Sequence, residues 1–185
     1  MSETPVKPAD QRPEHPDFWC KRFGAGATPW DAGGVQEAFR RFVAAQDKPL
    51  NTLIPGCGSA WDAAYLAGYG WPVIALDFSP TAVELARDVV GDAPVDLVCA
   101  DFFTYAPPAP LDLIYERAFL CALPRKLWDD WGQRVADLLP SGALLAGFFF
   151  ICEQLKGPPF GILPEQLDAL LTPHFERIED SDAHD

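Results

Sequence analysis

The chain has 185 residues and carries 27 acidic side chains against 14 lysines and arginines, which gives a net charge of −13. A chain of this length forms a single domain with a sizeable core, because folding buries roughly 70% of its unfolded surface. The negative charge repels nucleic-acid backbones and anionic membranes, and no apolar run approaches the roughly 20 residues that a membrane span needs. We therefore expect neither a nucleic-acid partner nor a membrane partner.

The N-terminus and the cysteines indicate the compartment. The first residues are polar and proline-rich and contain no signal-peptide core, which predicts a cytoplasmic protein. The five cysteines form no Cys-x-x-Cys pair. We therefore expect reduced thiols, with neither a disulfide framework nor a bound metal.

The first predicted elements include an aromatic segment. Residues 1–12 are expected to be a disordered lead. A short helix around Phe18 and Phe23 is followed by a loop that glycines and Pro29 interrupt, and this loop carries Trp30. A tryptophan in such a loop is either a lid over a ligand or a plug for the core.

A second helix is predicted over residues 35–43, where the apolar side chains share one face. Residues 13–45 are predicted to form an N-terminal lid within one domain that spans residues 13–179. The acidic residues 180–185 are expected to be a mobile tail.

The stretch from Asn51 to Pro80 organises the rest of the chain. An apolar strand enters a turn with Gly56 and Gly58, a helix of small residues follows, and a second apolar strand ends at Asp77. Glycines after a strand let the backbone approach a ligand closely, and the following helix presents its free N–H groups. An acid about 20 residues further on suits the two hydroxyls of a ribose. This β-α-β unit is therefore expected to hold a nucleoside-like cofactor.

The details of the turn distinguish between cofactors. A dinucleotide site usually has a third glycine next to the pyrophosphate, whereas Trp61 and Asp62 follow the turn here. An indole and a carboxylate fit better near an adenosyl group that carries an amino acid. After the second strand, Ser79 and Pro80 predict the N-cap and first turn of another helix, and we include Phe78 at this strand tip in the candidate site.

The next two strand tips carry further candidates. The third strand leads to Asp101 and Phe102, which are suited to accept the adenine amino group and to stack on its ring; alternatively, the acid caps a local turn. The fourth strand leads to Arg117, which either binds an anionic group or neutralises its neighbour Glu116. All these tips are expected at one rim of the sheet, where open α/β sheets bind ligands.

Helices and strands alternate to the end of the chain. The elements predicted after the central unit are strands Val95–Cys99 and Leu111–Tyr115, helix Pro124–Leu139, strand Ala143–Ile151, helix Leu163–Leu171 and a sixth strand Phe175–Glu179. A stiff loop around Pro158 and Pro159 is expected to cover the substrate side of the rim. The alternation predicts an α/β fold with a mostly parallel sheet and helices on both faces.

Five short motifs follow one another between residues 15 and 179. They are Phe18-Trp19 with Thr28-Pro29-Trp30-Asp31; Ile54-Pro55-Gly56-Cys57-Gly58-Ser59; Leu76-Asp77-Phe78-Ser79-Pro80; Tyr115-Glu116-Arg117-Ala118-Phe119-Leu120-Cys121-Ala122-Leu123; and Gly157-Pro158-Pro159-Phe160. Together they resemble the class I S-adenosylmethionine-dependent methyltransferases, and more closely the thiopurine and thiol methyltransferase family with its plant thiocyanate and halide methyltransferase relatives.

The resemblance implies a three-layer Rossmann-like methyltransferase fold, S-adenosyl-L-methionine as cofactor and a small-molecule methyl acceptor. Carried over residue by residue, it places the following side chains or backbone groups at the cofactor: Trp30, Gly56, Asp77 and Arg117, with Asp101 and Phe102 at the adenine. For Trp30, the resemblance favours contact with the cofactor over packing into the core.

The sequence departs from the family pattern in two places. No sequence is left after residue 185 for the last strand of the complete fold, so we expect an incomplete C-terminus, or a sheet edge that is bare or closed by a partner. The chain also carries Gly-Cys-Gly where typical thiopurine enzymes have Leu-Cys-Gly-Lys. Thiols or small soft anions therefore fit the acceptor site at least as well as thiopurines.

These features predict a methyltransferase that acts on a small thiol, a thiopurine-like compound, or a soft anion such as thiocyanate or halide. We assign no catalytic base, because a thiol is partly ionised at neutral pH and the three histidines lie outside the motifs. The alternatives are a non-catalytic S-adenosylmethionine-binding module and an NAD-dependent oxidoreductase, which the missing third glycine disfavours.

Overall fold

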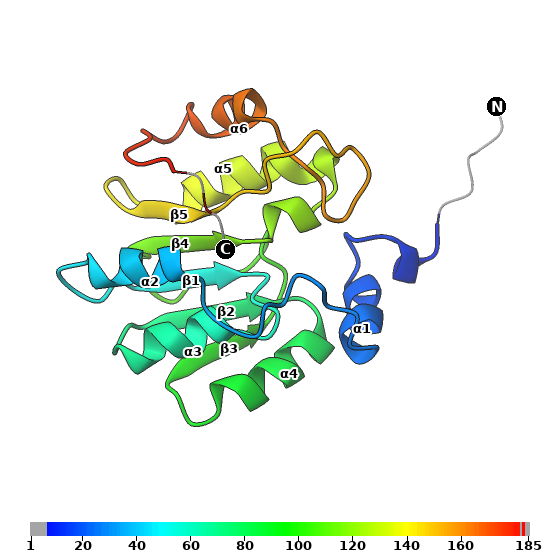
Figure 1. Ribbon diagram of the computed structural model, residues 1–185, viewed down its shortest axis with the longest axis horizontal. Helices are drawn as coiled ribbons and strands as arrows, with labels where there is room; N and C mark the ends of the chain where they lie inside the picture. The colour runs from blue at the N-terminus through cyan, green and yellow to red at the C-terminus, as the bar shows by residue number, and fades with distance from the viewer. Residues whose placement is uncertain (1–6, 182, 184–185) are drawn as a thin grey trace.

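Five parallel strands form the central layer of the computed structural model, which describes residues 7–181 and 183 (Figure 1). The strands are β1 (Thr52–Pro55), β2 (Val73–Asp77), β3 (Val95–Cys99), β4 (Leu113–Arg117) and β5 (Leu144–Phe148). Their order in the sheet is β3-β2-β1-β4-β5, so the winding of the chain reverses between β1 and β4. In an open α/β sheet this switch point opens a crevice at the carboxyl ends of the strands.

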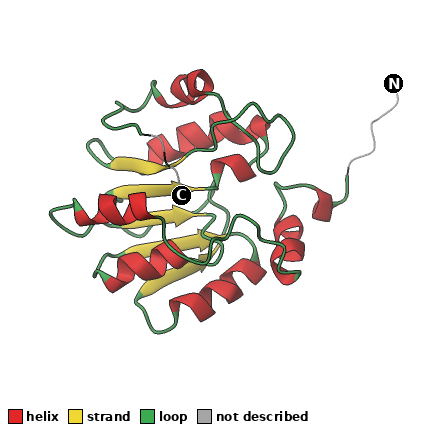
Figure 2. Cartoon of the chain, in the orientation of Figure 1, coloured by secondary structure: helices red, strands yellow, loops and turns green. Residues whose placement is uncertain are grey.

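Helices cover both faces of the sheet (Figure 2). One face carries α2 (Glu37–Ala44), α3 (Trp61–Gly68) and α4 (Pro80–Val90). The other carries α5 (Trp128–Leu138) and α6 (Pro164–Leu171), and the short 3-10 helices η2 (Leu120–Ala122) and η3 (Arg125–Leu127) precede α5. Each face has its own hydrophobic core, because each helix buries one apolar stripe against the strands.

The central strands are buried along their whole length. Every residue of β1 and β2 is buried, as expected for parallel strands that are covered on both sides. Leu53 lies opposite Ile74 and Pro55 opposite Leu76. The backbone N–H of Cys57 then donates to the Leu76 carbonyl oxygen at 3.0 Å, which continues the ladder past the end of β1. The turn after β1 is thereby fixed beside the tip of β2.

The parallel sheet with helices on both faces confirms the predicted fold class. The predicted sixth strand, Phe175–Glu179, is wrong, because the described residues after α6 contain no strand. The side chain of Ile178 is 79% exposed, and Arg177 forms ion pairs with Asp168 on α6 and with Asp180. These contacts connect the segment to α6 and leave no strand pairing with β5.

The N-terminal segment lies beyond the carboxyl ends of the strands (Figure 1). It contains η1 (Ala9–Gln11) and α1 (Pro16–Gly24). The prediction of a disordered lead is wrong for residues 9–11, where Asp10 accepts an ion pair from Lys21 on α1 at 2.9 Å. Residues 1–6 of that lead, and residues 182, 184 and 185 of the predicted tail, lie outside the described residues.

The predicted lid over residues 13–45 divides into two parts. α1 packs against α4 and stays at the rim of the sheet, whereas α2 belongs to the sheet face. Phe39 of α2 stacks on Tyr115 of β4 with a centroid distance of 3.8 Å, and Val43 is also buried. Of the predicted lid, α1 and the loop that follows it therefore remain at the rim, where they can cover a site. No helix within the described residues combines the length and apolar character needed to cross a membrane.

Candidate functional site

The turn after β1 uses backbone conformations that favour glycine. Gly56 has φ +59° and Gly58 has φ +51°, and Ala60 follows with φ +60°. A Cβ atom built on Gly56 would lie 2.4 Å from the ring of Phe119, which follows β4. The turn is therefore tight because the segment after β4 packs directly against it.

Asp77 lies at the tip of β2 and holds this turn in place. Its Oδ2 accepts the backbone N–H of Gly58 at 3.1 Å, and its Oδ1 accepts the backbone N–H of Ser79 at 2.9 Å. Burial raises the pKa of this carboxyl group to about 6, although the backbone N–H donors lower it. Each carboxylate oxygen has a further lone pair for a ligand hydroxyl.

Ser79 connects the rim of the sheet to α1. Its hydroxyl accepts the backbone N–H of Ala82 at 3.3 Å, which confirms the predicted N-cap of α4. The Cys20 thiol of α1 lies 3.2 Å from the same hydroxyl. This contact places α1 at the amino-terminal end of α4, beside Asp77.

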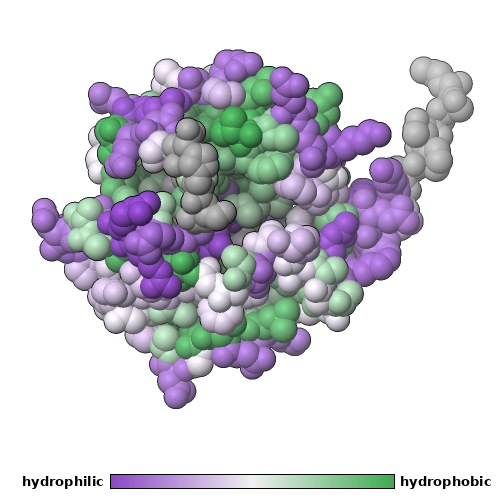
Figure 3. All heavy atoms as spheres, viewed as in Figure 1, coloured by the Kyte–Doolittle hydropathy of each residue, from purple (hydrophilic) through white to green (hydrophobic). Residues whose placement is uncertain are grey.

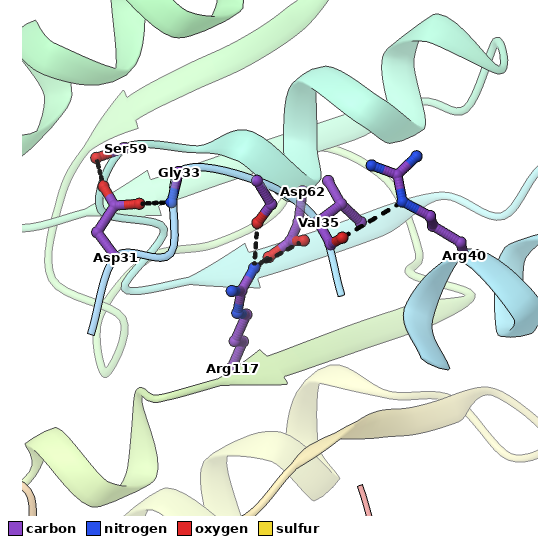
Figure 4. A network of polar contacts seen from close by, with 8 residues as sticks. Asp31, Gly33, Val35, Arg40, Ser59, Asp62 and Arg117 are labelled. Atoms are coloured by element: carbon purple, nitrogen blue, oxygen red, sulfur yellow. Dashed lines mark hydrogen bonds and ion pairs between the residues drawn. The ribbon is translucent and has the colours of Figure 1, made fainter. Parts of the chain in front are cut away.

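Arg117, at the end of β4, forms an ion pair that the sequence did not predict (Figure 4). Its Nη1 donates to Asp62 Oδ2 at 2.8 Å and Oδ1 at 3.1 Å, and to the Gly34 carbonyl oxygen at 3.1 Å. The interpretation that Arg117 neutralises Glu116 is therefore wrong, because the guanidinium turns to α3. Burial raises the pKa of Asp62, and the positive charge of Arg117 offsets part of this effect. The pair joins β4, α3 and the loop after α1.

The loop after α1 is anchored at the glycine turn. Asp31 accepts hydrogen bonds from the Ser59 hydroxyl and from the backbone N–H of Gly33 (Figure 4). The neighbouring Trp30 contacts the edges of Trp19 and Phe23, with centroid distances of 5.6 and 5.9 Å. Its side chain is still 37% exposed. An aromatic cluster with one accessible face therefore lies at the rim.

A cleft of about 600 Å³ opens at the rim on the α5 side of the sheet. Phe78, Asp101 and Phe103 line it from the tips of β2 and β3, and Leu123 and Leu127 line it from the segment before α5. The Asp101 carboxylate accepts the backbone N–H of Phe103 at 2.9 Å, so this acid also caps a local turn, as the alternative interpretation had it.

The structure corrects the position expected for Phe102. This ring is only 2% exposed and packs in the α5-side core, where it meets the edge of Phe119 at a centroid distance of 5.2 Å. Phe103, one residue on, is the ring that lines the cleft. Both residues lie in the turn after β3, where the backbone N–H of Phe103 donates to Asp101, so the conformation of this turn decides which ring faces the cleft.

Glu116 is a buried acid that the sequence analysis did not place in the site. Its side chain is 1% exposed. Its carboxylate accepts the backbone N–H groups of Phe119 at 2.9 Å and of Leu120 at 3.1 Å. Burial raises the pKa of Glu116 to about 7, which outweighs the effect of these donors. The sequence feature that indicates a site residue here is the position of Glu116, an acid at the end of an apolar strand.

These residues fit an adenosyl cofactor that carries an amino acid. The glycine turn, Asp77, the cleft at Phe78 and the Arg117–Asp62 pair lie along one rim, at the switch point between β1 and β4. Within residues 7–181 and 183, no cluster of His, Cys, Asp and Glu side chains is arranged to hold a metal ion.

The chain matches the thiopurine S-methyltransferase family over residues 14–185. It is 35% identical to a probable thiol methyltransferase 2 of Arabidopsis thaliana, over 86% of this chain and 74% of that protein. It is 31% identical to thiocyanate methyltransferase 1 of Brassica oleracea, over 84% and 71%. It is 29% identical to a thiopurine S-methyltransferase of Pseudomonas fluorescens, over 82% and 78%.

Solved structures share the fold at low sequence identity. Magnesium protoporphyrin IX methyltransferase from Synechocystis, with bound S-adenosylmethionine, superposes with a TM-score of 0.72 at 13% identity, over 93% of this chain and 88% of that chain. The 1,6-didemethyltoxoflavin-N1-methyltransferase of Burkholderia thailandensis, with bound S-adenosylhomocysteine, gives 0.67 at 17% identity, over 94% and 81%. The chain belongs to the thiopurine S-methyltransferase family and is an S-adenosylmethionine-dependent methyltransferase.

Proposed function

We propose that the rim of the sheet binds S-adenosylmethionine and transfers its methyl group to a sulfur atom of a small thiol or thiopurine-like compound, or to thiocyanate or halide. The observation that carries this proposal is the arrangement of the glycine turn, Asp77 and the cleft at Phe78 along one edge. The names of the relatives, which include thiol, thiocyanate and thiopurine methyltransferases, support the same acceptor class.

The proposed cofactor contacts follow the strand tips. Asp77 accepts the ribose hydroxyls, next to the backbone of Gly56 and Gly58. Phe78 and Asp101 hold the adenine in the cleft, with Phe103 as its aromatic wall in place of Phe102.

The other end of the cofactor lies toward α3 and the loop after α1. Arg117 and Asp62 form a charged pair there that is suited to the amino-acid group, because both signs are present. Trp30 offers an aromatic face to the sulfonium, which cations favour. Arg117 is already paired, so its main effect is to position Asp62 and the loop.

When bound, S-adenosylmethionine supplies an activated methyl group, so the protein has mainly to align the acceptor with it and exclude water. α1 and the loop after it lie at the rim, where they can cover the site. The tight turn at Gly56 fixes the position of the neighbouring Phe119 ring. α1, the loop after it and the Phe119 ring thus enclose the position at which the methyl group is transferred.

The compartment and the partners are part of the proposal. The five free cysteines suit a cytoplasmic protein with reduced thiols. The net charge of −13 opposes binding to nucleic acids, so a small-molecule acceptor is the proposed partner.

Calorimetry and a methyl-acceptor screen test the proposal. S-adenosylmethionine should bind the protein at one site, while NAD should show no heat of binding. Asp77→Ala should raise the Kd for S-adenosylmethionine at least about tenfold, which corresponds to the loss of roughly one charge-assisted hydrogen bond. Labelled cofactor should then transfer its methyl group to at least one member of a panel of thiols, thiocyanate and halides. Binding without turnover on the whole panel would instead support a non-catalytic S-adenosylmethionine-binding module.

A further inference from the structure

Glu116 borders a small aromatic cavity beside the proposed cofactor site. The cavity lies between the ends of β4 and β5, η2 and the loop after β5, and its walls include Glu116, Cys121, Phe148, Phe149, Phe150 and Phe160. Its free space is about 10 Å³, which is close to what one water-sized group needs. In the space-filling view, hydrophobic surface gathers in this part of the molecule (Figure 3).

The cavity is coupled to the glycine turn through one residue. The Phe119 ring packs on Gly56, while the backbone N–H of Phe119 donates to the Glu116 carboxylate at 2.9 Å. A single residue, Phe119, therefore links the Glu116 carboxylate to the glycine turn of the proposed cofactor site. An acceptor that enters the cavity lies on the β4–β5 side of that turn.

The Glu116 carboxylate retains acceptor capacity. A carboxylate offers about four lone pairs, and the backbone N–H groups of Phe119 and Leu120 are the donors that reach it within hydrogen-bond distance among the described residues. The geometry thus leaves room for a hydrogen-bond donor from a ligand.

The surroundings provide no counter-charge among the described residues. Cys121 of η2 lines the same cavity, and burial together with the Glu116 charge raises the pKa of its thiol to about 12, so it stays neutral. From β5 and the following loop, the neighbours are aromatic or aliphatic. Arg117, the next residue of β4, turns to Asp62 on α3. Within the part of the chain that the structure describes, the ionised carboxylate therefore has no cationic partner, and it is a proton acceptor in a low-dielectric cavity.

We infer that Glu116 accepts the proton of a small neutral thiol and that this chain methylates such thiols in preference to thiocyanate or halide. This inference rests on the proposed function and names the acceptor class of that site. The S–H bond breaks as its proton passes to a Glu116 oxygen. The sulfur lone pair forms the new S–C bond with the methyl group, the methyl–sulfonium bond breaks with its electron pair going to the departing thioether sulfur, and the proton on Glu116 then leaves to solvent.

The same carboxylate disfavours small anions. A thiocyanate or halide ion in this cavity would lie beside an ionised carboxylate with no cationic side chain between them among the described residues, and like charges in a desolvated site repel strongly. An S–H group has the opposite polarity, because its hydrogen points to the carboxylate. The small free space also excludes a purine ring.

The test compares ethanethiol with thiocyanate and iodide, in wild-type protein and in Glu116→Gln. The amide keeps an oxygen for the backbone N–H groups of Phe119 and Leu120 but cannot take a proton. For ethanethiol, Glu116→Gln should lower kcat/KM about 100-fold near pH 7.5. For thiocyanate and iodide it should raise kcat/KM, because the amide removes the negative charge that repels these anions. Glu84→Gln, the same substitution at an exposed position of α4, is the matched control and should behave as wild type.

Two readouts do not depend on the variant's turnover. In wild type, kcat/KM for ethanethiol should rise with pH around 7 and exceed that for thiocyanate at least tenfold at pH 8. In the protein without cofactor, a protonated-carboxyl infrared component should titrate near pH 7 and be missing from Glu116→Gln, while the component of Asp77, which titrates near pH 6, remains. The Glu116 component supports the inference even if the variant folds poorly.

The outcomes separate this inference from the proposed function. If wild type methylates thiols but Glu116→Gln has the same rate and pH profile, the role of Glu116 is wrong while the proposed function stands. A wild-type preference for thiocyanate or iodide over ethanethiol overturns the acceptor class. If no acceptor of the panel is methylated at all, the proposed function fails first.

Discussion

At the scale of single residues, two glycines of the same turn differ in what surrounds them. Both have a positive φ, so any Cβ strains the backbone at either position. At Gly56 the Cβ would also meet the Phe119 ring at 2.4 Å, whereas at Gly58 it would contact Phe23 at an ordinary 3.5 Å. Only Gly56 combines strain with a steric clash.

This difference predicts unequal costs for the same substitution. Gly58→Ala should lose about 1 kcal/mol of unfolding free energy from backbone strain. Gly56→Ala should lose about 3 kcal/mol, because displacement of Phe119 adds to that strain. For a chain of this size, the melting temperatures should fall by about 3 °C and about 9 °C. Equal shifts for the two variants in differential scanning calorimetry would show that Phe119 does not restrict the turn.

At the scale of elements, α1 and the loop after it form an adjustable cover on a rigid sheet. Three contacts hold this cover: Cys20 to Ser79 of α4, Asp31 to Ser59, and Arg117 to the Gly34 carbonyl oxygen. Trp30 lies between these anchors with an accessible face. Its aromatic contacts with Trp19 and Phe23 stabilise the loop, while the exposed face is available to a ligand.

Trp30→Ala should therefore weaken cofactor binding more than it weakens the fold. We expect the free energy of unfolding to fall by about 1 kcal/mol, which is the value of an aromatic contact. The Kd for S-adenosylmethionine should rise at least about fivefold, because a cation–π contact contributes about 1 kcal/mol. Tyr69→Ala is the control, because Tyr69 is 62% exposed and contacts Tyr65 at the other end of α3. Titration calorimetry should show an unchanged Kd for that variant; an unchanged Kd in Trp30→Ala would restrict this tryptophan to packing.

At the scale of the whole molecule, two buried acids influence the pH dependence of stability. Burial raises the pKa of Asp77 from 3.8 to about 6 and that of Glu116 from 4.5 to about 7. Between these values the folded protein keeps protons that the unfolded chain has released. The contribution of the two groups to stability is therefore greatest below about pH 4 and is lost as the pH rises through their folded pKa values.

The joint contribution of Asp77 and Glu116 to the free energy of unfolding should decrease between pH 4 and pH 8. Each group contributes about 3 kcal/mol of this change, since one pKa unit corresponds to about 1.4 kcal/mol. The double variant Asp77→Asn, Glu116→Gln removes both titrations, so its stability relative to wild type should increase as the pH rises through this window. Urea midpoints at several pH values measure this difference. A constant difference across the window would mean that these carboxyl groups titrate near their ordinary pKa values.

The local pattern of the sequence was sufficient for most of the fold. Apolar strands before glycines and acids, with helices between them, predicted β1 to β5 and the N-cap at Ser79, because hydrophobic periodicity and capping are local properties. It failed at Phe175–Glu179, which follows a helix as a further strand would, but whose Arg177 pairs with Asp168 on α6. Strand pairing depends on a partner, and the sequence does not show whether a partner edge is used.

The sequence by itself determined that the strand tips with the glycine turn, Asp77 and Arg117 gather at one rim, because every strand of a parallel sheet ends at the same edge. Only the tertiary structure decided how their side chains pair and point. It placed Arg117 against Asp62 and not Glu116, put Phe103 and not Phe102 in the cleft, and left Glu116 buried among aromatic rings. Ion pairing, rotation at a strand end and desolvation all depend on contacts between segments distant in the chain, and these contacts exist only after folding.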